Sequence, residues 1–99
     1  MKKIKKYVDW ICDEVEGAKC YAEHYVEYKA KGDSTVASRF HQMSEDELKH
    51  AEMIHELAVR EIETLNQVFK APEWMQDEWD KSHVNYVEKA AWVRQMLSM

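Results

Sequence analysis

Two long amphipathic stretches of this sequence are separated by the short break Gly32-Asp33-Ser34. Glycine suits the C-terminal end of a helix, and Asp or Ser suits the N-cap of the next helix. The apolar residues on both sides of the break recur three and four positions apart, which is the spacing of one face of an α-helix. Helices joined by so short a turn must lie antiparallel, so the break predicts a helical hairpin.

A second break, Ala71-Pro72-Glu73, ends the second stretch, because Pro at a first helical position is typical of a helix start. Gly17 lies inside the first stretch, where it costs the helix about 1 kcal/mol without ending it. We therefore predict three helices, at about 3–31, 34–70 and 73–97. The expected fold class is all-α, an antiparallel hairpin plus a third helix in one domain, residues 1–99.

The composition excludes several classes of protein. Fourteen Lys and Arg against nineteen Asp and Glu give a net charge of −5 over 99 residues, so we expect no nucleic-acid partner. No apolar run approaches the roughly 18 residues that span a membrane. The basic N-terminus lacks an apolar signal core, so we expect a cytoplasmic protein. Cys12 and Cys20 form no disulfide framework.

The size of the core indicates an assembly. The apolar stripe of the first helix consists of Ile4, Val8, Ile11, Val15, Ala18, Ala22 and Val26. The two long helices need cover on both sides of such stripes, and one short third helix does not supply enough. We therefore expect a homodimer, or a higher homo-oligomer, in which two hairpins form a four-helix bundle.

Charged residues inside the apolar stripes are the informative ones. Glu47 falls in the centre of the apolar face of the second helix, and His50 lies one turn later on the same face. A carboxylate in a core needs a partner or a metal. The E-x-x-H spacing directs a carboxylate and an imidazole toward a common point, which suits an ion that takes oxygen and nitrogen ligands.

The first helix offers a matching carboxylate. Glu14 falls in the apolar arc 18 residues before Gly32, and Glu47 lies 15 residues after it. At about 1.5 Å per residue the two carboxylates lie within about one turn of each other across the hairpin. Glu16 matches the level slightly better but faces the polar side, so Glu14 is the first choice and Glu16 the reserve.

These residues resemble a known family. Glu14, Tyr21 seven positions later, and Glu47-x-x-His50 resemble the first half of a ferritin-like di-iron carboxylate protein, with rubrerythrins and bacterioferritins the nearest pattern. The resemblance covers roughly residues 7–65. It implies that Glu14, Glu47 and His50 are iron ligands, that Glu47 bridges two irons, and that Tyr21 lies near the site as its catalytic residue.

The resemblance also implies how the centre is completed. Full-length members have four helices and carry a second carboxylate and E-x-x-H set in their second half. This sequence has no such second half, so its plan is closer to that of the half-length encapsulated ferritins. There, two identical chains complete the di-iron centre. The implied activity is that of a ferroxidase, the oxidation of Fe(II) by oxygen or peroxide at two ions shared between two chains. Manganese or zinc suits the same ligands.

Other interpretations stay open. Ser44-Glu45-Asp46-Glu47 also fits a capping box, in which Glu47 merely caps a helix that begins at Ser44. Glu61 is a reserve ligand or pairs with a Lys or Arg. His83 is a third reserve ligand or bonds Asp80 one turn before it. Glu52-x-x-His55 is a second E-x-x-H, which we interpret as accidental because Glu52 lies on the solvent face.

A second hypothesis belongs to a different class of function. The chain would be a small helical interaction module, in which Glu14, Glu47 and His50 form a metal-free buried cluster that sets the helix register. Three tryptophans, Trp74, Trp79 and Trp92, would then give the third helix a surface for a protein partner.

Overall fold

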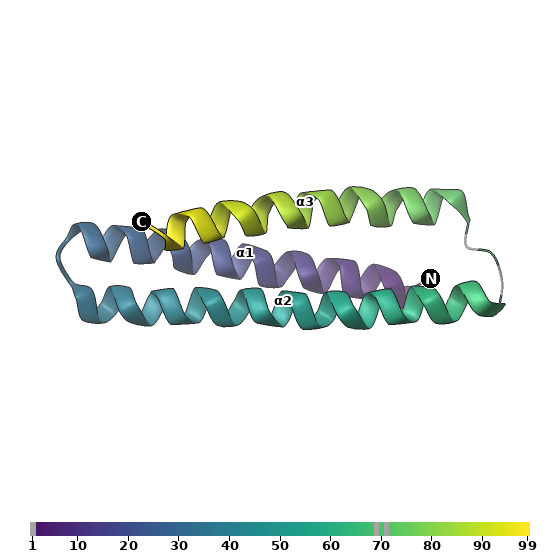
Figure 1. Ribbon diagram of the computed structural model, residues 1–99, viewed down its shortest axis with the longest axis horizontal. Helices are drawn as coiled ribbons and strands as arrows, with labels where there is room; N and C mark the ends of the chain where they lie inside the picture. Colours follow the sequence, from purple (N-terminus) through teal and green to yellow (C-terminus); the bar gives the residue numbers. More distant parts are fainter. Residues whose placement is uncertain (1, 69, 71) are drawn as a thin grey trace.

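The computed structural model describes residues 2–68, 70 and 72–99 and contains three α-helices. Helix α1 spans Lys2–Ala30, α2 spans Ser34–Val68 and α3 spans Glu73–Leu97. No strand occurs within the described residues, so the all-α prediction is confirmed. The Cα atoms fill a rod of 55 × 17 × 17 Å, in which α1 and α2 run antiparallel and α3 returns alongside them toward the hairpin turn (Figure 1).

The helix bounds differ slightly from the predicted ranges. Helix α1 begins and ends one residue earlier than expected, and α2 ends at Val68 instead of 70. Phe69 and Ala71 lie outside the described residues. Pro72 precedes the first turn of α3 as its N-cap, with φ −60° and ψ 142°, instead of occupying the first helical position. Its fixed φ and missing N–H are compatible with either place.

The hairpin turn satisfies its own backbone groups. Gly32 has a φ of +80°, a conformation that glycine adopts without strain. Its N–H donates to the Lys29 carbonyl at 3.0 Å, and the Asp33 N–H donates to the Tyr28 carbonyl at 3.0 Å, which is the Schellman pattern. The Asp33 carboxylate then accepts a hydrogen bond from the Val36 N–H at 3.1 Å and caps α2. The turn therefore fixes where α1 ends and where α2 begins.

Small side chains bring α1 and α2 close together. Ala18 and Ala22 of α1, and Ala51 and Ala58 of α2, are fully buried. One core cluster combines α1 and α2 with the C-terminal half of α3: Ala18, Ala22, Leu48, Ala90, Val93, Met96 and Leu97. A second, nearer the N-terminus of α1, consists of Ile11, Val15, Ala51 and Ile54.

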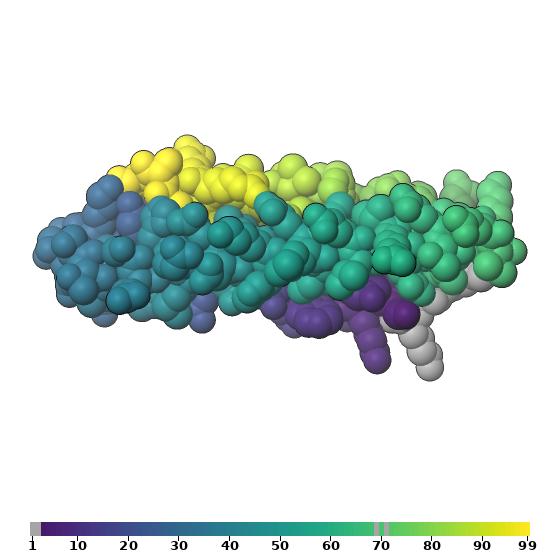
Figure 2. Space-filling view, turned by 60° about the horizontal axis from the view of Figure 1, so that its bottom comes forward, coloured from purple at the N-terminus to yellow at the C-terminus, as the bar shows by residue number. Residues whose placement is uncertain are grey.

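Helix α3 covers one side of the hairpin. It packs mainly against α1 and touches α2 less. In Figure 2, α3 lies along one side of α2 and the N-terminal part of α1 emerges on the other. Trp79 packs on the second core cluster, whereas Trp74 and Trp92 are exposed. No helix among the described residues is long and apolar enough to cross a membrane.

Ser44 corrects the capping-box interpretation. It lies ten residues inside α2, which begins at Ser34, so Ser44 and Glu47 cap no helix. Its side chain is completely buried, and its hydroxyl donates to the backbone carbonyl of Ala18 in α1 at 2.7 Å. A buried hydroxyl needs such a partner. The bond therefore joins the two helices of the hairpin directly.

We expect Ser44→Ala to lower the free energy of unfolding by about 1–2 kcal/mol, because a buried hydrogen bond between two helices is lost. Urea unfolding followed by circular dichroism measures the change. Ser38→Ala, at an exposed position of α2, is the control and should change little. Equal effects of the two variants would contradict a stabilising role for the Ser44 bond.

Candidate metal centre

Three ionisable side chains from two helices meet on the hairpin. They are Glu14 of α1 with Glu47 and His50 of α2, and one ligand atom from each lies within 4.8 Å of the others. Nδ1 of His50 is 3.5 Å from Oε2 of Glu14 and 3.8 Å from Oε1 of Glu47. Two carboxylates and an imidazole are a donor set for iron, manganese or zinc. The residues that the sequence singled out first are thus brought together.

The helices position this cluster by register and periodicity. Glu47 and His50 are three residues apart on α2 and so share one face. Glu14 meets them because the antiparallel hairpin sets it at nearly the same height as Glu47. The next residue of similar charge on α1, Glu16, is turned about 200° around the helix from Glu14 and cannot reach the same point.

The cluster is partly buried and contains no Lys or Arg. The side chain of Glu14 is 18% exposed, that of Glu47 27% and that of His50 49%. Oε2 of Glu14 is buried and has no hydrogen-bond partner among the described residues. A buried carboxylate oxygen without a partner is costly. A cation held between the two carboxylates would satisfy that oxygen.

The pKa of Glu47 is raised from its ordinary 4.5 to about 7. The largest cause is Glu14, to which the protonated Glu47 acid can donate a hydrogen bond. Burial and repulsion by the Glu14 charge act in the same direction, while His50 opposes them. Two ionised carboxylates at this distance need a proton or a cation between them.

Gly17 leaves room for the Glu47 carboxylate, a role that sequence reasoning missed. A Cβ atom at Gly17 would lie 3.1 Å from Oε2 of Glu47 and 3.7 Å from its Cδ. The carboxylate of Glu47 thus rests against the backbone of α1 in space that any other residue would reduce. The helix-weakening glycine, three residues after Glu14, is explained by this close approach.

Tyr21 lies farther along the hairpin. Its ring stacks on Phe40, with 6.2 Å between the ring centroids. Seven residues separate Tyr21 from Glu14, which is about 10 Å along the helix axis. Tyr21 is therefore on the same face as the cluster but about two turns from its carboxylates.

Two of the three reserve residues form ion pairs outside the cluster. Glu16 is exposed and pairs with Lys89 of α3, which lowers the pKa of Glu16 mainly through the hydrogen bond between them. Glu61 pairs with Lys3 at 3.5 Å. The expectation that Glu61 contacts a basic residue is thus met, by a lysine at the start of α1.

The third reserve residue, His83, has a partner that sequence reasoning missed. Its Nδ1 lies 3.1 Å from Nε2 of His55. The expected partner, Asp80, instead accepts a hydrogen bond from Gln76 at 3.0 Å. Glu52, the first residue of Glu52-x-x-His55, is exposed as expected and pairs with Arg94. The contact of His55 with α3 was not predicted, because an exposed Glu52 says nothing about the side of α2 on which His55 lies.

The cluster lies on the side of the hairpin away from α3. His50 is about 140° around α2 from His55, which contacts α3. Three large apolar residues are exposed on this side, Trp10 one turn before Glu14 and Met43 and Leu57 seven residues from His50 on either side. We call this surface, formed by Trp10, Met43, Leu57 and the cluster, the open face of the hairpin.

We expect Glu47→Gln to stabilise the metal-free protein more at about pH 8 than at about pH 5. Between its ordinary pKa and about 7, folded Glu47 keeps a proton that the unfolded chain has lost. The free energy of unfolding therefore falls as the pH rises through this window, and glutamine removes that loss.

Chemical unfolding of chelator-treated protein at the two pH values measures the difference between variant and wild type. Glu16→Gln is the control, since Lys89 lowers the pKa of Glu16 and its removal gives no such gain. A gain from Glu47→Gln that is the same at both pH values would contradict the raised pKa.

The chain matches the model of a known protein family over most of its length. The family model described as Rubrerythrin matches residues 9–95. No curated protein and no solved structure is significantly similar to the chain. The matched range includes Glu14, Glu47 and His50.

Proposed function

Since the chain belongs to the rubrerythrin family, a family of ferritin-like di-iron carboxylate domains, we propose that it binds iron through Glu14, Glu47 and His50. The observation that carries this proposal is the buried, unpartnered Oε2 of Glu14 beside Glu47 and His50. A divalent cation would satisfy that oxygen and replace the proton that Glu47 otherwise holds. The choice of iron rests on the family, because manganese and zinc accept the same ligands.

We propose further that two chains share the centre through their open faces. One chain offers two carboxylates and one imidazole, which is half of the set that holds two ions in di-iron helical bundles. A second copy would supply the same three groups, and the four carboxylates would balance two divalent charges. The exposed Trp10 and Leu57 support this arrangement, since a second hairpin would bury them and form a four-helix bundle.

The proposed reaction is the oxidation of Fe(II), the substrate, by oxygen or peroxide. Iron supplies the one-electron chemistry when bound. The chain's own residues hold the ion and exclude part of the solvent, and Glu47 loses its proton as the ion binds. Tyr21 remains a predicted catalytic residue. Because it lies about two turns from Glu14, it would act on the centre without touching the ion directly.

We expect the wild-type protein to retain about one iron per chain after aerobic addition of Fe(II) and desalting. Glu14→Gln, Glu47→Gln and His50→Gln should each lose it, because each removes a ligand. Mass spectrometry of the metal content measures the ratio, and circular dichroism checks that the variants stay helical.

Glu16→Gln is the matched control for Glu14→Gln, because it removes a carboxylate two residues away that is paired to Lys89. It should keep the iron. A helical wild-type protein that retains no iron would contradict the proposed function and leave the interaction module as the better hypothesis. Retained iron without oxygen or peroxide consumption would contradict the ferroxidase activity alone.

We expect Leu57→Lys to shift the protein from dimer to monomer and to release iron, because a second copy would bury this side chain. Leu57 is 50% exposed in the single chain, so the substitution should leave the fold intact. Light scattering after size-exclusion chromatography measures the mass. Val84→Lys, at an exposed position of α3, is the control and should remain a dimer. A dimer that survives Leu57→Lys would contradict assembly through the open face.

A further inference from the structure

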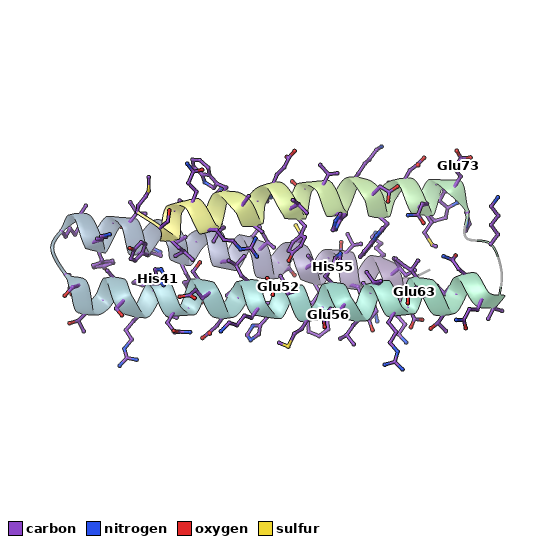
Figure 3. The ribbon with its side chains drawn as sticks, in the orientation of Figure 1. His41, Glu52, His55, Glu56, Glu63 and Glu73 are labelled. Atoms are coloured by element: carbon purple, nitrogen blue, oxygen red, sulfur yellow. The ribbon has the colours of Figure 1, made fainter. Side chains whose placement is uncertain are left out.

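A pair of histidines connects α2 with α3 on the opposite side of α2 from the candidate centre. Nε2 of His55 and Nδ1 of His83 are 3.1 Å apart, and the two ring centroids are 4.9 Å apart. Figure 3 shows His55 on the edge of α2 that faces the other helices, whereas Glu56 lies away from them. Neither histidine belongs to the cluster of Glu14, Glu47 and His50.

Aromatic rings hold both imidazoles in place. Trp79 and Tyr86, both on α3, stack on His55 with centroid distances of 5.4 and 5.7 Å. Trp79 also stacks on His83. Burial lowers the pKa of His55, and the neighbouring His83 lowers it further, so His55 is held in the neutral form that binds metals.

The distance between the two nitrogens fits two ligands of one ion. Imidazole nitrogens at 2.0–2.1 Å from a tetrahedral ion lie about 3.3 Å apart. The observed 3.1 Å is close to that value, and it joins two helices that otherwise have few direct links. The carboxylates one turn before each histidine are engaged elsewhere, Glu52 with Arg94 and Asp80 with Gln76. Water would therefore complete the coordination.

We propose that His55 and His83 form a second metal site, which binds a divalent transition ion with a preference for imidazole, such as Zn²⁺. The ion would replace the hydrogen bond between the two rings and connect α3 to α2. The site does not depend on the proposed iron centre, because no residue is shared and His50 is about 140° away around α2.

The test uses a Glu47→Gln/His50→Gln double variant, which removes the other candidate ligands on α2. We expect this protein to bind about one Zn²⁺ per chain in calorimetry and to unfold at a higher temperature when Zn²⁺ is present. Adding His55→Gln or His83→Gln should abolish both effects. His41→Gln is the matched control, because His41 also contacts α3, through the Leu97 carbonyl, but has no imidazole partner.

Two results would overturn the proposal. One is a double variant that binds no Zn²⁺, and the other is binding that survives both His55→Gln and His83→Gln. If either glutamine variant does not fold, His83→Phe replaces it, since phenylalanine keeps a ring against Trp79 and offers no ligand. Circular dichroism without metal verifies the fold of every variant. If the wild-type protein binds no iron, this test of the His55–His83 site is not affected.

Discussion

The close antiparallel contact between α1 and α2 is the constraint on which the rest of the structure depends. Fully buried alanines on both helices let the backbones approach, and the Ser44 hydroxyl bonds directly to the α1 backbone. This contact brings Glu14 to the height of Glu47, and the glycine at position 17 leaves the Glu47 carboxylate more room against α1 than a larger residue would. Helix α3 packs its apolar residues against one side of this helix pair, and the open face lies on the other side.

Much of this arrangement follows from local features of the sequence. The period of the apolar residues and the break at Gly32-Asp33-Ser34 predict the three helices, their order and the hairpin, because helical periodicity and end signals are local properties. The cluster was predictable for a related reason. Glu14 and Glu47 are charged residues where the period calls for apolar ones. In an antiparallel hairpin, their distances in sequence from the turn set their heights along the rod, and these are similar.

The features that were missed depend on how the helices turn about their axes against one another. Gly17 could be recognised only as a weak point of a helix, because its use lies in a side chain 30 residues away. The pairing of His55 with His83 depends on the rotation of α3 against α2, which no period within either helix reveals. Asp80 has the right spacing to bond His83, yet Gln76, one turn before it, donates to its carboxylate instead.

The turn between α1 and α2 has a consequence for how the chain can vary. Surface connections usually tolerate insertions and deletions. In this turn, Gly32 and Asp33 terminate one helix and cap the next with no spare residue between them. An added residue would shift α2 along α1 by about 1.5 Å and turn it by about 100° if the helix absorbed it. Although the turn is exposed, its length should therefore be as restricted in related chains as a buried position.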